Sequence, residues 1–174
     1  MICCREKETN RGRQLRHLIK RIGVQELSYQ YDLVKGPGQG VYQSDPGSTD
    51  TLFFYGDLIA GVLPDTSEYF GIIHYQVGDM LYPFVSTFEK SGNLIARKRI
   101  GVGACGGLTI DIDTCVDQVT INKNLEIESV YKVIGIAEDS TGQEIRICNQ
   151  IKGKGKITSK GRIEYSETEI IDCN

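Results

Sequence analysis

The sequence predicts an all-β protein, an antiparallel meander of hairpins forming a sandwich or barrel, preceded by a short N-terminal basic helix or tether. From Thr51 onward the chain is a series of short runs rich in Ile, Val, Tyr, Phe and Thr, which favour strands. Turn residues separate these runs, and no later run has the spacing of an amphipathic helix. The 174 residues suit one domain that buries roughly 70% of its unfolded surface.

The first element is a basic leader, residues 1–35. Within it, residues 10–22 carry apolar side chains at helical spacing, with Asn10 as N-cap and Gly23 as stop. This leader is partly helical or disordered, because an isolated helix of this length is marginally stable in water. A run rich in Gly and Pro then leads into the single β domain, residues 36–174.

Charge is distributed unevenly along the chain. The protein has 20 basic and 23 acidic residues, a net charge of −3. Residues 1–22 hold seven of the bases and two of the acids, a net of +5, and the remaining 13 bases and 21 acids give −8. An acidic body argues against nucleic-acid binding, since phosphate contacts need clustered cations. The basic leader is either a solvated tail or a contact for an anionic surface.

Four turns predict hairpins within the β domain. Ser91-Gly92, Ser140-Thr141-Gly142 and Lys160-Gly161 each lie between two alternating runs, and Asn122-Lys123-Asn124 is a fourth turn of this kind. Because βαβ units need helices between strands, consecutive antiparallel hairpins are the expected topology.

The cysteines suggest a disulfide framework. Four of the six lie in the body, at Cys105, Cys115, Cys148 and Cys173, and four cysteines allow three pairings. If Lys160-Gly161 is a two-residue turn, Ser159 faces Arg162 and facing residue numbers sum to 321, as 148 and 173 do. The two cysteines would then face each other with Cα atoms about 4.5 Å apart, within the range of a disulfide.

This pairing depends on an uninterrupted ladder. A bulge at Gly153 or Gly155 would turn Cys148 to the other face, and the alternative is a pair of buried free thiols. Cys105 and Cys115 would then close the short loop between them. None of the cysteines has the CxxC spacing of a zinc site.

Two ligand-like motifs are better explained by structure. Residues 101–106 match GxGxxG, but the residues that follow are strand-like, whereas a dinucleotide needs a helix N-terminus there. Asp111, Asp113 and Asp117 offer carboxylates for Ca²⁺, yet a strand spaces alternate side chains ~6.6 Å apart. A solvated acidic strand face is the preferred interpretation. We expect neither a metal nor a cofactor.

Catalytic residues are unknown from the sequence. His74 is the only histidine outside the leader. A general base needs a nucleophile and an orienting carboxylate, and the sequence places neither beside it. The GxSxG nucleophile motif is absent. His74 is therefore interpreted as a strand residue.

The N-terminus suggests a lipid anchor. The chain begins Met-Ile-Cys-Cys and then turns polar, as a bacterial lipoprotein does around its cleavage site. Cys3 or Cys4 would then be the lipidated residue, and the true start would lie upstream of Met1. No run approaches the ~18 apolar residues of a membrane-spanning helix. The body cysteines favour an oxidising compartment, periplasmic or on the outer surface.

Residues 52–170 resemble small bacterial surface or periplasmic lipoproteins of unassigned activity. The resemblance is carried by LIAGVLPDTSEYFGIIHYQVGDMLYPFVSTFEKSGNLI, by VTINKNLEIESVYKV and by KGKITSKGRIEY. It implies a β domain behind a lipidated cysteine and brings no activity with it.

The function expected from the sequence is a non-enzymatic, extracytoplasmic cell-envelope domain with a binding or structural role. Its partner would be another envelope protein, with no nucleic acid and with the membrane reached only through a lipid anchor. One alternative is a secreted hydrolase or inhibitor with an unrecognised site. Another is a cytoplasmic immunity-type protein, which would keep its thiols free.

Overall fold

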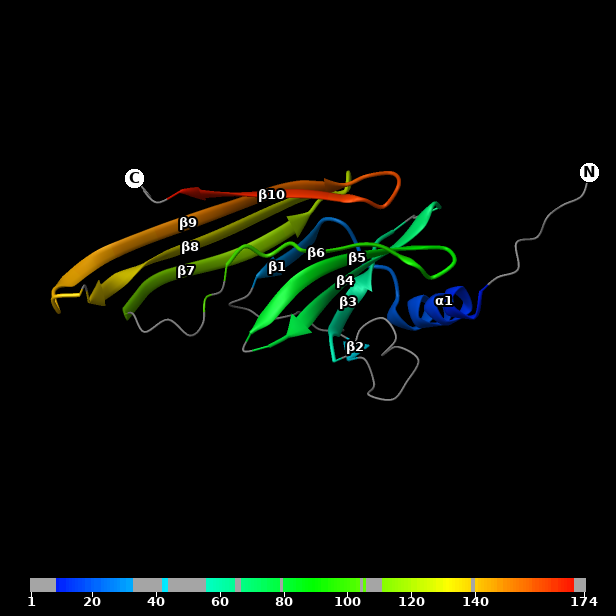
Figure 1. The fold of residues 1–174 in the computed structure, drawn as a ribbon, viewed down its shortest axis with the longest axis horizontal. Helices are drawn as coiled ribbons and strands as arrows, with labels where there is room; N and C mark the ends of the chain where they lie inside the picture. The colour runs from blue at the N-terminus through cyan, green and yellow to red at the C-terminus, as the bar shows by residue number, and fades with distance from the viewer. Residues whose placement is uncertain are drawn as a thin grey trace, which may run out of the picture.

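Two five-stranded antiparallel sheets make up the fold of this computed structural model (Figure 1). The structure describes residues 9–32, 42–43, 56–64, 67–78, 80–103, 105, 111–138 and 140–170. The sheets are open and share one core, so the predicted all-β antiparallel fold is confirmed and takes the form of a sandwich.

Each sheet is a meander. The first sheet contains, in chain order, β2 (Tyr42–Gln43), β3 (Leu58–Val62), β4 (Tyr69–Val77), β5 (Leu81–Glu89) and β6 (Leu94–Arg99). The second contains β7 (Asp111–Ile121), β8 (Glu126–Glu138), β9 (Glu144–Ile157) and β10 (Ile163–Ile170), with β1 (Tyr29–Asp32) added beside β7.

The core lies between the inner faces of the two sheets. Strand alternation supplies it, because every second side chain of a strand points to the same face. In β4, Tyr69, Ile73 and Tyr75 point inward, whereas Ile72 points to the outer face. The second sheet contributes Tyr29, Tyr31, Val119, Ile121, Ile127 and Ile157.

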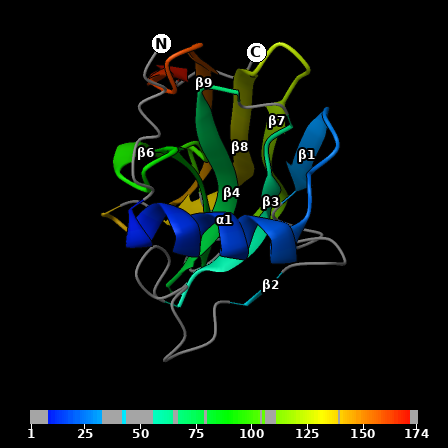
Figure 2. The same ribbon diagram turned by 90° about the vertical axis from the view of Figure 1, so that its right-hand side faces the viewer.

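The helix α1 (Asn10–Ile22) packs on the outer face of the first sheet (Figure 2). Its buried Leu15 and Leu18 contact a patch that contains Ile72. The predicted N-cap, Asn10, is wrong by one residue: Thr9 is the N-cap, and its side chain accepts a hydrogen bond from the Gly12 N–H at 3.1 Å. Gly23 ends the helix as predicted.

The residues after α1 join both sheets. The Gln25 N–H donates to the Val62 carbonyl at 2.7 Å, which places this segment beside β3. β1 then pairs with β7, with Tyr29 opposite Ile121. Residues 10–32 of the predicted leader are therefore packed into the fold.

The hairpin between β9 and β10 corrects a prediction. Its loop has three residues, closed by a hydrogen bond from the Thr158 N–H to the Arg162 carbonyl, with Gly161 at φ 75°. A type I turn followed by a left-handed glycine gives this three-residue loop. Facing residue numbers therefore sum to 320, as in Ile157 opposite Ile163, and not to 321.

The ladder itself is uninterrupted. It continues through Gly153 and Gly155 to Gln150 opposite Ile170 without a register shift. The expected weak point at the glycines does not exist, and the error lies in the length of the turn. The described ladder ends at Ile170, before Cys173, so it does not test the pairing of Cys148 with Cys173.

The molecule is elongated, with different elements at its two ends. β7, β8 and β9 run past the edge of the first sheet, and their far end is the β8–β9 turn (Figure 1). We call residues 134–148, the outer part of this hairpin, the arm. α1 lies at the opposite end of the long axis. Within the described residues, no helix is long and apolar enough to cross a membrane.

Candidate functional site

Three polar side chains form a line on the outer face of the first sheet. His74 Nδ1 lies 2.8 Å from Asp57 Oδ2, and His74 Nε2 lies 2.8 Å from Ser86 Oγ. Asp57 directly precedes β3, His74 belongs to β4, and Ser86 belongs to β5. A serine, a histidine and an aspartate in this order match the arrangement of a hydrolytic triad.

The register of the β4–β5 hairpin explains this meeting. Ile72 pairs with Ser86 and His74 pairs with Phe84, so His74 and Ser86 are diagonal neighbours on one face. On the other side His74 pairs with Ile59, two residues after Asp57. The alternation of side chains along each strand could be read from the sequence. Which residues of neighbouring strands face each other could not, and this register is what brings the three side chains together.

Burial keeps the histidine neutral. Desolvation lowers the pKa of His74, and the bond to Asp57 opposes this only in part. Arg97 also donates to Asp57 Oδ2 at 3.0 Å, and this cation lowers the pKa of His74 further. A neutral imidazole between a hydroxyl and a carboxylate is electronically suited to act as a base.

The three side chains are too buried for a substrate to reach them. The exposed fractions of Asp57, His74 and Ser86 are 4%, 0% and 1%. Ser86 lies within β5, with β4 paired on one side and β6 on the other. A hydrolytic serine needs an open approach and N–H donors aimed at the developing oxyanion. In this conformation the group is a sealed polar link between β3, β4, β5 and β6.

A second polar group lies between the sheets. Asp117 is only 1% exposed, and burial raises its pKa to about 6. Its Oδ1 and the Tyr31 hydroxyl have no hydrogen-bond partner within the described part of the chain. Nearby, the hydroxyls of Tyr29 and Tyr75 bond to each other.

The burial of Asp117 contradicts the prediction that Asp111, Asp113 and Asp117 form one solvated acidic face of a strand. β7 has a register shift between Ile112 and Thr114, which changes the face of the following residues. Asp117 therefore points into the core, whereas the side chain of Asp113 is 52% exposed. Among the described residues, no three His, Cys, Asp or Glu side chains are arranged to hold a metal ion.

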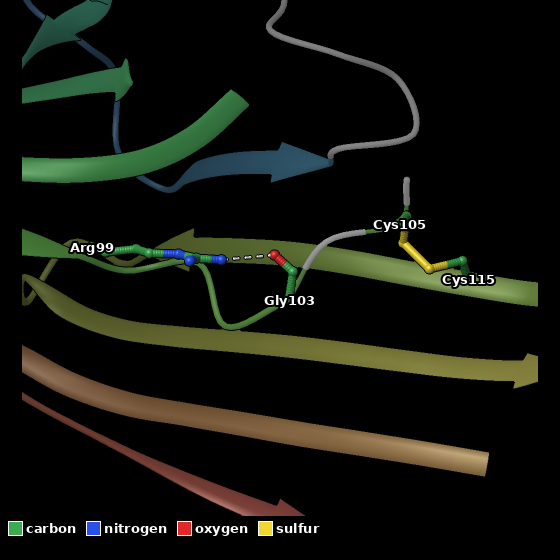
Figure 3. The surroundings of a disulfide bond; sticks show 4 residues. All are labelled: Arg99, Gly103, Cys105 and Cys115. Carbon is green, nitrogen blue, oxygen red and sulfur yellow. Dashed lines mark hydrogen bonds between the residues drawn. A yellow bond between two sulfur atoms is a disulfide. The ribbon is translucent and has the colours of Figure 1, made fainter. Parts of the chain in front are cut away.

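A disulfide fixes the connection from the first sheet to the second (Figure 3). Cys105 and Cys115, paired in the sequence prediction, are joined with an S–S distance of 2.03 Å. Before it, the Arg99 side chain donates to the carbonyls of Gly101 and Gly103 at 2.8 and 3.0 Å. Gly101 and Gly103 of the GxGxxG run thus belong to a packed connection.

Gly103 explains why that connection needs glycine. A Cβ on Gly103 would lie 2.0 Å from the ring of Tyr131. The backbone of the connection therefore rests directly on the inner face of β8, where Val102 packs with Tyr131 and Val133.

Most of the other cysteines lie outside the residues that the structure describes. Cys148 is disulfide-bonded. Cys173 and the two expected lipidation residues, Cys3 and Cys4, lie outside the described residues. The Cys148–Cys173 pair and the lipid anchor stay predictions.

A shallow groove of about 580 Å³ lies over β8, β9 and β10. Its charges alternate across the strands: Glu126 faces Lys156, which faces Glu164. Lys156 Nζ lies 3.6 Å from Glu164 Oε2, and both side chains are more than half exposed. The groove therefore presents no uniform charge that would select a ligand.

The arm carries apolar side chains on both faces. Ile136 faces Arg146 and Ile145 faces Ala137, so the two isoleucines point to opposite sides of the hairpin. Ile136 is 38% exposed and Ile145 is 43% exposed. The β8 run Val133–Ala137 is apolar or glycine at every position.

Comparison of the chain with protein-family models, with curated proteins and with solved structures gives no match. The fold and the geometry of these sites are therefore the basis for assigning a function.

Proposed function

We propose that this protein is a non-enzymatic, extracytoplasmic domain of a cell envelope that binds another envelope protein through its arm. The observation that carries the proposal is the pair of exposed isoleucines, Ile136 and Ile145, on opposite faces of the arm.

A strand that is apolar at successive positions is characteristic of a sheet covered on both faces. The run Val133–Ala137 has this pattern. Val133 packs with Val102 and Tyr131, whereas the end of β8 that follows it extends beyond the first sheet (Figure 1). Core packing alone does not account for isoleucines on both sides there. A partner that encloses the arm would remove this apolar surface from water.

The compartment is part of the proposal. The Cys105–Cys115 disulfide supports an oxidising location, since disulfides rarely persist in the cytosol. A cytoplasmic immunity-type protein would keep these thiols free. Mass spectrometry of non-reduced peptides, from protein alkylated inside the cells that make it, should recover Cys105 and Cys115 as one linked peptide. Separately alkylated cysteines would contradict the location.

Site-specific photo-crosslinking tests the binding site. A benzoylphenylalanine at Ile136 or Ile145, in cells that produce the protein natively, should give one discrete adduct with a different protein. Leu94, an apolar side chain 52% exposed on β6, provides the matched control position and should give none. Ile145→Lys should remove the adduct formed from position 136. An adduct of two copies of this chain, or equal adducts from position 94, would exclude the proposal.

A serine hydrolase is the second candidate, favoured by the Ser86–His74–Asp57 line. A fluorophosphonate probe labels activated serines, so it separates the two candidates. We expect no labelling, because Ser86 is 1% exposed. Stoichiometric labelling that Ser86→Ala abolishes, in a variant with unchanged circular dichroism, would establish the hydrolase instead.

A further inference from the structure

The orientation of α1 is fixed by its contacts with the first sheet. Leu15 and Leu18 are 0% and 1% exposed against the outer face of that sheet. Gly12 lies close to the β5–β6 turn, where a Cβ would be 2.7 Å from the Lys90 carbonyl oxygen. The apolar side of the helix is therefore packed against the sandwich.

The opposite side of α1 is cationic. No acidic residue occurs in the helix, and Arg13 and Lys20 are exposed on the side away from Leu15 and Leu18, with Arg16 and Arg21 beside them. We call this surface the cationic face. Residues 23–174 hold a net charge of −8, so the cationic face is opposite in sign to the rest of the chain.

We propose that the cationic face binds the anionic headgroups of a phospholipid membrane. Lys and Arg near an anionic bilayer are attracted to its negative surface potential. Because the apolar side of α1 is occupied, the contact is electrostatic and does not insert into the hydrocarbon. This inference rests on the proposed envelope location and adds a membrane contact that needs no lipid anchor.

Charge complementarity favours a membrane over a nucleic acid. A flat bilayer meets the molecule only at the end where α1 lies (Figure 1). An extended polyanion that tracks across the protein would also meet the acidic body. A membrane at this end thus meets the cations of α1, while Glu138 and Glu144 of the arm lie at the far end of the molecule (Figure 1).

Vesicle co-sedimentation tests the proposal with the unacylated full chain. Vesicles of equal parts phosphatidylglycerol and phosphatidylcholine should bind the protein at low salt, and vesicles of phosphatidylcholine alone should not. Raising the salt to about 0.3 M should release it, because screening shortens the range of the attraction. Arg13→Glu combined with Lys20→Glu should weaken binding at least about tenfold.

The matched control is Lys152→Glu combined with Lys154→Glu. These exposed lysines lie on β9, in the other sheet, and their reversal changes the net charge equally. This variant should keep its vesicle binding. Equal losses in both variants, equal binding to phosphatidylcholine, or tighter binding to a 30-nucleotide single strand than to the anionic vesicles would overturn the proposal.

The crosslinking test of the arm does not depend on this one. If the arm gives its adduct and the vesicles do not bind, the membrane contact is wrong and the partner-binding function stands. The converse result removes the function proposed for the arm and keeps the lipid surface.

Discussion

Asp117 is a buried carboxyl group whose ionisation opposes folding at neutral pH. Burial is the main cause of its raised pKa of about 6, with Asp32 adding to it and Arg99 opposing it. The unfolded chain has a pKa near 3.8 at this position. Below that value both states are protonated. As the pH rises to about 6, the folded state retains a proton that the unfolded state has lost, so stability decreases across this interval.

Asp117→Asn should therefore stabilise the protein at pH 7.5, by on the order of 1–3 kcal/mol. The gain should shrink as the pH falls from 6 towards 4, because wild-type Asp117 becomes neutral as well. Urea unfolding at pH 7.5 and 4.5 measures both differences. Asp113→Asn, at a side chain 52% exposed, is the control and should change stability little at either pH. A less stable Asp117→Asn protein at pH 7.5 would mean that Arg99 compensates the charge.

His74 acts in the opposite direction. Its pKa is lowered from 6.5, so below that pH the unfolded state takes up a proton that the folded state refuses. Stability from His74 is therefore lost as the pH falls below 6.5. In wild-type protein this loss is partly cancelled by Asp117. The same urea series at pH 6.5, 5.5 and 4.5 should thus fall more steeply for Asp117→Asn than for wild type.

At the scale of single elements, local signals were sufficient for the predictions that succeeded. The spacing of Leu15, Leu18 and Ile22 predicted the helix at residues 10–22, and Gly23 marked its end. The turn glycines Gly92, Gly142 and Gly161 marked three hairpins, and all three have positive φ angles. These features depend on a few adjacent residues, which is why the sequence alone was enough.

The predictions that failed depended on register. The same sequence, Ser159-Lys160-Gly161, can form either a two-residue turn of Lys160-Gly161 or a loop of all three residues. The structure has the three-residue loop, so the numbers of facing residues sum to 320 and not to 321. The shift in β7 near Asp113 has no local mark either, and it buries Asp117. The Ser86–His74–Asp57 line was invisible for the same reason, because it joins residues through the pairing of three strands.

Engineered disulfides test the corrected register. Lys154 faces Ser166 in the β9–β10 ladder, and both residues are exposed. Lys154→Cys combined with Ser166→Cys should therefore oxidise readily, since facing residues lie within disulfide range. Lys154→Cys with Glu167→Cys, which the sum of 321 would bring together, should not. Peptide mapping by mass spectrometry reads both results, and a 154–167 linkage would restore the register predicted from the sequence.

At the scale of the whole molecule, the two surfaces proposed to bind partners lie at opposite ends of the long axis. The cationic face of α1 lies at one end, and the apolar arm lies at the other (Figure 1). β9 alone has 14 residues, so at ~3.3 Å per residue it separates its two ends by roughly 45 Å. A protein held to a membrane at α1 would therefore present the arm well above the lipid surface.

Two serines at opposite ends of β9 report on this orientation. Ser140 lies in the turn of the arm and Ser159 in the turn before β10, and both are exposed. A fluorescent donor at Ser159 should be quenched more strongly than one at Ser140 when the protein binds anionic vesicles carrying an acceptor-labelled lipid. The difference follows from the length of β9 and from the β9–β10 turn lying at the α1 end (Figure 1). Arg13→Glu with Lys20→Glu should abolish the quenching at both positions. Equal quenching at the two serines would mean that the long axis lies flat on the membrane, and stronger quenching at Ser140 would place the arm itself against the lipid.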